Sequence, residues 1–320
     1  MTSRPLHVVV GAGSVGLAVV DELRAREGEE AVDVRVVNRS GVAEVNPDVE
    51  VVGADVTDHD QARRACADAR VVYNCTNAPY TDWAERFPPI WEGVLAGAMA
   101  ADAVLVCADN LYCYGAVDGP LTEDLPWDAD TRKGRVRAEM GRRVLDAHEA
   151  GEVRATLGKA SDFYGPRVRE STVGERVFGN LLDGKSAEVV GDPDQPHTYT
   201  YVRDFARALV LLGGDERAWG DVWHVPSATT LTTREFVELV AEEAGRAPRM
   251  RVAPGWLVRL AGVVSPTMRE LAEMRYEFEA PFVVSHEKFD ATFDLDPTPH
   301  REAIAATVDW YRRVSVSPGR

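Results

Sequence analysis

Apolar and polar positions follow two alternating patterns along the first half of the chain. Short, nearly continuous apolar runs predict strands that are buried on both faces of a sheet. The predicted strands are 6–10, 32–38, 49–55, 70–76, 103–108 and 153–158. Apolar residues at helical spacing predict helices at 14–27, 58–69, 85–101 and 131–150. Because helices separate successive strands, the pattern predicts an α/β fold with a doubly wound parallel sheet.

The pattern changes after about residue 165, where Gly and Pro become frequent, as in "GDPDQPH". The later segments with helical spacing are 203–213, 232–245, 267–278 and 300–313. We therefore expect a sheet domain over 1–165, with return segments near 199–225. Residues 166–320 are expected to form a smaller, mostly helical C-terminal cap that binds substrate.

Composition narrows the classes of partner. The 320 residues carry a formal net charge of −16, which disfavours nucleic acid. The most apolar stretch includes Glu92 and Asp102, so it predicts a helix followed by a strand and no membrane partner. No secretory signal opens the chain, and a cytoplasmic location is expected. The four cysteines are widely spaced, so no metal site is expected.

A glycine-rich turn lies between the first strand and the first helix. The stretch "VVVGAGSVG" places Gly11, Gly13 and Gly16 in a GxGxxG pattern, with Ser14 and Val15 opening the helix. Gly11 permits a tight turn, Gly13 lets the backbone approach a pyrophosphate, and Gly16 lets helix and strand pack closely. This context, strand then turn then helix, predicts a dinucleotide site at the helix N-terminus.

The end of the second strand bears on which dinucleotide binds. An Asp or Glu there would bind the 2′-hydroxyl of NAD. This chain instead has Asn38, Arg39 and Ser40, and an arginine can pair with a 2′-phosphate. NADP(H) is therefore favoured, while NAD(H) remains an alternative.

Several further segments resemble the extended short-chain dehydrogenase/reductases, which include the NAD-dependent epimerases and dehydratases. The resemblance runs from residue 6 to about 245 and implies a Rossmann fold. It rests on "GADVTD", "NCTNAP", "CADNLYCYG" and "GKASDFYGP". It implies that Asp55 and Val56 flank the adenine and that Thr76 and Asn77 lie beside the cofactor ribose. Lys159 stands where the family usually has an arginine, and it is expected to bind the cofactor.

The catalytic motif of that family, Tyr-x-x-x-Lys, is altered in this chain. When "TRKGRVRAE" is aligned on Glu139, Thr131 takes the Tyr position and Arg135 the Lys position. Asn110 takes the position of the Ser or Thr. Threonine is too weakly acidic to replace tyrosine as acid or base. Arg135 is expected to bind the nicotinamide ribose, and the other cations of the stretch, Arg132, Lys133 and Arg137, are expected on the solvated helix surface.

Other residues are candidates for the missing chemistry. Asp162 matches a family Asn that faces the substrate pocket, and it could act as acid or base, or pair with Lys159. Tyr112 could supply a phenol or simply pack under the cap. Asn110 could polarise a carbonyl or complete a turn. His197 is expected to be a surface or hydrogen-bonded residue.

Three functions remain open at this point. The first is an NADP(H)-dependent oxidoreductase acting on a small carbonyl or imine metabolite without the usual Tyr-Lys pair. The second is a non-redox lyase, isomerase or cyclase, with Asp162 and Tyr112 as acid and base. The third is an NADP-sensing regulator. A small-molecule substrate is expected, and a homodimer through the helices at 85–101 and 131–150 is possible.

Overall fold

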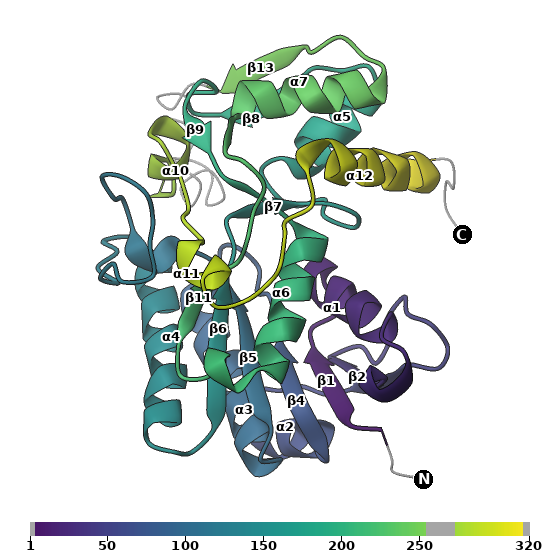
Figure 1. Cartoon of the computed structure of the whole chain (residues 1–320), viewed down its shortest axis with the longest axis vertical. Helices are drawn as coiled ribbons and strands as arrows, with labels where there is room; N and C mark the ends of the chain where they lie inside the picture. The colour runs from purple at the N-terminus through teal and green to yellow at the C-terminus, as the bar shows by residue number, and fades with distance from the viewer. Residues whose placement is uncertain (1–3, 254–272, 316–320) are drawn as a thin grey trace. The chain divides into compact units, whose positions relative to one another are not determined.

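The computed structural model describes residues 4–253 and 273–315, and these residues form two compact units (Figure 1). Among the described residues, the first unit comprises 4–115, 126–160 and 205–225. The second comprises 116–125, 161–204, 226–253 and 273–315. No helix among the described residues is long and apolar enough to cross a membrane.

The first unit is built on a seven-stranded parallel sheet with the strand order β11-β6-β5-β4-β1-β2-β3. In chain order the strands are β1 (Leu6–Val10), β2 (Asp33–Asn38), β3 (Glu50–Gly53), β4 (Ala69–Asn74), β5 (Val104–Asp109), β6 (Arg154–Lys159) and β11 (Val222–His224). Figure 1 shows the central strands side by side. The predicted doubly wound parallel sheet is confirmed.

Helices cover both faces of this sheet. They are α1 (Ser14–Arg24), α2 (His59–Ala65), α3 (Trp83–Ala100), α4 (Arg132–Glu149) and α6 (Val202–Gly214), with short helices η1 (Gly28–Glu30), η2 (Tyr112–Tyr114) and η4 (Glu216–Ala218). Val72 of β4 packs in one core cluster with residues of α2, α3 and α4. Its neighbours Val71 and Tyr73 point to the other face, where a Cβ on Gly213 of α6 would meet both. This burial on both faces explains why the strands are continuous apolar runs.

Most predicted elements are found within a few residues. Asp58 caps α2, since its side chain accepts from the backbone N–H groups of Asp60 and Gln61. Gly151 follows α4 with φ +72°, the left-handed conformation of a helix stop. Strand β11 was not predicted, because three residues are too few to establish a period.

The second unit has its own core and several short strands. The strands are β7 (Asp162–Tyr164), β8 (Ala187–Val190), β9 (Pro196–His197), β10 (Tyr199–Tyr201), β12 (Leu231–Thr232) and β13 (Met250–Ala253). The helices are a π-helix η3 (Gly174–Gly179), α5 (Asn180–Leu182), α7 (Thr233–Ala244), α10 (Tyr276–Glu279), α11 (Glu287–Asp290) and α12 (His300–Ser315). Most of the predicted helix 267–278 lies outside the described residues.

Parallel pairing of β7 with β10 positions one part of the candidate site. Tyr199 is the register partner of Asp162, so the chain just before Tyr199 passes close to Asp162. The core around these strands is aromatic: Phe236 contacts Tyr164 at 4.9 Å and Tyr199 at 4.5 Å between ring centroids. This packing stabilises the pairing of β7 with β10, which brings the end of β9 close to the start of β7.

Candidate functional site

The turn after β1 requires two of its glycines for steric reasons. Gly11 has φ +105°, and a Cβ there would lie 2.5 Å from the carbonyl oxygen of Cys75. A Cβ on Gly16 would lie 1.9 Å from the carbonyl oxygen of Gly11. Both distances are far below van der Waals contact, so a side chain at either position would displace backbone. The turn and the close packing predicted for these residues are both present.

Gly13 differs from its two neighbours in the motif. It is the N-cap of α1 with φ −78°, and a Cβ there would meet nothing within 4 Å. No side chain caps α1, and its first turn, which begins with Ser14 and Val15, contains no acidic residue. Uncapped N–H groups beside open space, at the positive end of a helix, suit a diphosphate. These residues therefore fit the dinucleotide that the sequence predicted.

The loop after β2 has one side chain that is free to meet a ligand. Asn38 is used within the loop, because its Oδ1 accepts from Ser40 Oγ at 3.0 Å and from Gly41 N at 2.8 Å. Its Nδ2 donates to the carbonyl oxygen of Val42 at 2.8 Å. Arg39 is exposed and has no ion-pair partner among residues 4–253 and 273–315.

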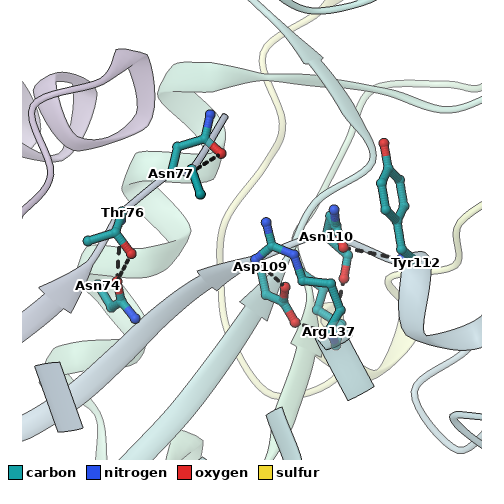
Figure 2. A network of polar contacts seen from close by, with 9 residues as sticks. Asn74, Thr76, Asn77, Asp109, Asn110, Tyr112 and Arg137 are labelled. Carbon is teal, nitrogen blue, oxygen red and sulfur yellow. Dashed lines mark hydrogen bonds and ion pairs between the residues drawn. The ribbon is translucent and has the colours of Figure 1, made fainter. Parts of the chain in front are cut away.

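The polar residues expected around the adenine and ribose stabilise local turns. Asp55 Oδ1 accepts from the backbone N–H and hydroxyl of Thr57, while Val56 is buried in the core. Thr76 donates its hydroxyl hydrogen to Asn74 Oδ1 at 2.7 Å (Figure 2). Asn77 Oδ1 accepts from the backbone N–H of Ala78. The placement of these residues beside a cofactor stays a prediction.

A buried ion-pair network lies at the carboxyl end of β5. Asp109 accepts from Lys159 Nζ through Oδ2 and from Arg137 through Oδ1 at 3.1 Å (Figure 2 shows the Arg137 bond). The Asp109 and Lys159 side chains are fully buried. Burial lowers the pKa of Arg137. Burial also acts to lower the pKa of Lys159, but the charges and hydrogen bonds of Asp109 and Cys113 together outweigh it and raise that pKa above its usual value. Lys159 thus pairs with Asp109, and not with Asp162 as the sequence had suggested.

The buried and exposed sides of helix α4 carry different cations from those that the sequence predicted. Lys133 and Arg137 are 2% and 6% exposed, so the expectation that they lie on the solvated surface is wrong. Lys133 Nζ lies 4.1 Å from the ring centroid of Tyr80, and the guanidinium of Arg137 lies 4.5 Å from that of Trp83. Arg135 is exposed and donates to the carbonyl oxygen of Asp130. The structure therefore brings Arg137, and not Arg135, to the network at the end of β5.

The loop after β5 carries the two remaining polar candidates of this unit. Asn110 Oδ1 accepts from the backbone N–H of Tyr112 at 3.2 Å, so the side chain completes a turn. Tyr112 stacks on Trp83 with ring centroids 5.7 Å apart. In Figure 2 its hydroxyl points away from the Asp109–Arg137 pair. The structure thus shows the turn and the packing, and it leaves a catalytic use of either residue as a prediction.

Comparison with known proteins accounts for this arrangement of turn, sheet and network. The sequence model of the NAD dependent epimerase/dehydratase family matches residues 7–223. The chain belongs to this family. An epimerase/dehydratase-like enzyme with a nicotinamide dinucleotide cofactor was predicted, and the match confirms it at the level of the family. The preference for NADP stays a prediction.

Individual relatives carry the names of enzymes of nucleotide sugars. A dTDP-glucose 4,6-dehydratase of Streptomyces antibioticus is 25% identical over 96% of this chain and 92% of its own. One of an Actinoplanes species is 26% identical over 62% of this chain, and the match spans about 57% of that enzyme's length. A dTDP-4-dehydrorhamnose reductase of Mycolicibacterium smegmatis is 30% identical over 62% of each chain. These names do not indicate a reductase of small carbonyls or imines, which the sequence had favoured.

Solved structures agree on the fold over the whole chain. A dTDP-glucose 4,6-dehydratase of Streptomyces venezuelae, determined with NAD, has a TM-score of 0.78 at 19% identity and covers 96% of this chain and 97% of its own. A UDP-glucose 4-epimerase of Thermotoga maritima has a TM-score of 0.78 at 17% identity, with 97% and 99% covered. At these identities the likeness shows the fold alone.

The cysteines of this family member are buried thiols. Burial raises the pKa of Cys66 to about 11 and that of Cys75 to about 12, so neither is a ready nucleophile. Among the described residues no group of three or more His, Cys, Asp and Glu side chains could hold a metal ion. The remaining candidates for acid–base chemistry are the carboxyl and imidazole groups of the second unit.

In the second unit Asp162 has a partner that the sequence did not assign to it. His197 Nε2 lies 3.0 Å from Asp162 Oδ2, and His197 Nδ1 lies 3.1 Å from the carbonyl oxygen of Glu277. His197 is 2% exposed, so it is a buried hydrogen-bonded residue and not a surface one. Glu277, which sequence reasoning missed, is also buried, and burial raises its pKa well above the usual value. The one sequence signal for Glu277 is its position as a polar residue within the helix predicted over 267–278.

Proposed function

We propose that this chain is an NADP(H)-dependent enzyme that exchanges a hydride with an alcohol or carbonyl carbon of a nucleotide-linked sugar. The observation that carries the proposal is the turn after β1, where the open Gly13 position meets the uncapped start of α1. The bound dinucleotide supplies the hydride chemistry. The substrate class comes from the name of a relative that aligns over nearly the whole chain. The sheet unit would bind the dinucleotide and the second unit the substrate.

The preference for NADP(H) rests on the loop after β2. Arg39 is exposed and unpaired among the described residues, and Ser40 beside it is exposed. β2 ends in Asn38, where an acidic residue would repel a 2′-phosphate. A guanidinium can pair with that phosphate through two parallel hydrogen bonds.

The sheet unit also supplies cations for the rest of the cofactor site. Lys133 and Arg137 are four residues apart on the buried side of α4, the spacing of the family's Tyr-x-x-x-Lys. We assign the role first given to Arg135 to Arg137. Thr131 is not a substitute for the missing tyrosine, because its hydroxyl oxygen caps α4 by accepting from Gly134 N at 3.1 Å. The proton donor and acceptor must therefore lie elsewhere.

Binding of NADPH and NADH to the full chain tests the cofactor. We expect NADPH to bind more tightly, and Arg39→Ala to weaken NADPH by roughly 10- to 100-fold while changing NADH by less than about threefold. Arg217→Ala is the control, because Arg217 is also exposed but lies in η4, just before β11 and hence near the opposite edge of the sheet. Equal affinities for NADPH and NADH in the Arg217→Ala control as well as in Arg39→Ala would remove the NADP assignment.

Turnover tests the reaction itself. The chain is incubated with NADP⁺ and dTDP-glucose or UDP-glucose, and separately with NADPH and a panel of small ketones and imines, and nicotinamide absorbance and sugar products are followed. Conversion of a nucleotide sugar supports the proposal. Conversion of the small compounds alone would contradict the substrate class. Tight NADPH binding without conversion of any compound would contradict the enzymatic function and favour a regulator.

A further inference from the structure

The pair formed by Asp162 and His197 has a defined set of hydrogens. A backbone carbonyl only accepts, so His197 Nδ1, which faces the carbonyl of Glu277, must carry a hydrogen. His197 Nε2 faces a carboxylate oxygen, so a second hydrogen lies between them. The pair therefore shares one hydrogen between His197 Nε2 and Asp162 Oδ2, while Nδ1 carries the other.

The surroundings of His197 fix the ring in place. It stacks on Phe278 at 5.4 Å and on Phe282 at 5.2 Å, and it contacts Tyr199 at 4.7 Å between centroids. The aromatic rings thus hold the imidazole where its Nε2 orients the Asp162 carboxyl group.

The other titratable groups around the pair are uncharged. Burial raises the pKa of Glu277 well above its usual value, and the charge of Asp162 acts in the same direction, so Glu277 is a neutral acid. Burial also raises the pKa of Tyr199, whose hydroxyl bonds to Thr233 Oγ1 at 2.8 Å.

Asp162 is the more accessible end of the pair. Its side chain is 17% exposed, compared with 3% for His197. Oδ2 is bound to His197, and Oδ1 has no hydrogen-bond partner among residues 4–253 and 273–315. A carboxylate with one anchored oxygen and one available oxygen is suited to take a proton from a bound molecule.

We propose that Asp162 is the proton acceptor and donor of this enzyme and that His197 is the residue that positions it. The inference rests on the proposed function. When an alcohol is oxidised, Asp162 Oδ1 would take its hydroxyl proton as the carbonyl forms, and the hydride acceptor would be a nicotinamide dinucleotide held by the turn after β1. Asp162 then releases the proton to solvent, and reduction follows the same path in reverse. The pair replaces the tyrosine that this chain lacks.

Kinetics with NADP⁺ and dTDP-glucose test the proton transfer. We expect Asp162→Asn to lower kcat by roughly 10²- to 10⁴-fold with NADPH affinity unchanged, because general acid–base catalysis is usually worth that much. Asp194→Asn is the control, since Asp194 is an exposed carboxylate of the same unit paired with Arg234. A wild-type chain that turns over the sugar while Asp162→Asn keeps its kcat would overturn this inference alone. A wild-type chain that binds NADPH and converts nothing would overturn the proposed function and the proton transfer together.

His197 needs a readout that a merely structural role would not move. His197→Gln keeps one hydrogen bond to Asp162 but carries no charge, so the carboxylate should titrate at higher pH and the rising limb of kcat/KM should move upward. In ¹⁵N-histidine-labelled full chain at pH 7, both ring nitrogens of His197 should be protonated, and Nε2 should lose its proton in Asp162→Asn. An unprotonated Nε2 in the wild type, or an unmoved pH limb, would refute the positioning role.

Discussion

At the scale of single residues, the glycines of the turn after β1 have separate functions. Gly11 and Gly16 are required by the protein's own backbone, because an added Cβ would overlap carbonyl groups. Gly13 has open space around it and an ordinary φ, so nothing in the described protein demands a glycine there. We infer that Gly13 is glycine for the sake of a ligand.

Two alanine substitutions separate these functions. Gly16→Ala should lower the free energy of unfolding by about 2 kcal/mol or more, because a Cβ at 1.9 Å from Gly11 O forces the backbone apart. Gly13→Ala should cost about 1 kcal/mol or less, since alanine is only a poorer N-cap, yet weaken NADPH at least about 10-fold. Urea unfolding and NADPH titration of both variants measure this. Unchanged NADPH binding by Gly13→Ala would place the diphosphate elsewhere.

Residues of the site differed in how far the sequence could predict them. The glycine turn was predictable because its pattern is local and spans six residues, from Gly11 to Gly16. The pairing of Asp162 with His197 was not, because it joins residues 35 apart through the pairing of β7 with β10. Three-residue strands leave no periodic signal from which that pairing could be derived.

At the scale of elements, α4 shows that a motif alignment can assign a residue to the wrong side of a helix. Aligning on Glu139 placed Arg135 at the nicotinamide ribose, whereas the structure exposes both Arg135 and Glu139. Val136, Met140 and Val144 are buried four residues apart, and Arg137 follows one position after the first of them. This apolar stripe, visible in the sequence, predicts the buried side correctly and would have selected Arg137 over Arg135.

Two arginines of α4 provide a matched test of this phase. Arg137→Ala should lower the free energy of unfolding by about 3 kcal/mol, because Asp109 is fully buried and would keep only Lys159 as partner. Arg135→Ala should change it by less than about 0.5 kcal/mol, because the side chain is exposed. Chemical denaturation of both variants decides. Comparable losses would mean that the two side chains are equally buried.

At the scale of the whole molecule, continuous apolar strands were enough to predict the sheet unit, because burial on both faces requires helices on both sides. The second unit was less predictable, since its core joins strands of two to four residues with aromatic rings from distant segments.

The sheet unit also buries a titratable side chain. His7 of β1 is 7% exposed, and its Nδ1 lies 3.2 Å from the hydroxyl oxygen of Tyr73.

His7 makes the stability of the chain depend on pH. Burial, with smaller contributions from Arg26 and Arg70, lowers its pKa from 6.5 to about 4. Between these values the unfolded chain binds a proton that the folded chain does not, so stability falls as the pH falls from about 6.5 towards 4. The free energy of unfolding should drop by about 2 kcal/mol from this group between about pH 7.5 and about pH 5. Urea unfolding at both values should show the drop reduced in His7→Gln and kept in His59→Gln, whose imidazole is exposed; an equal drop in all three proteins would assign it to other groups.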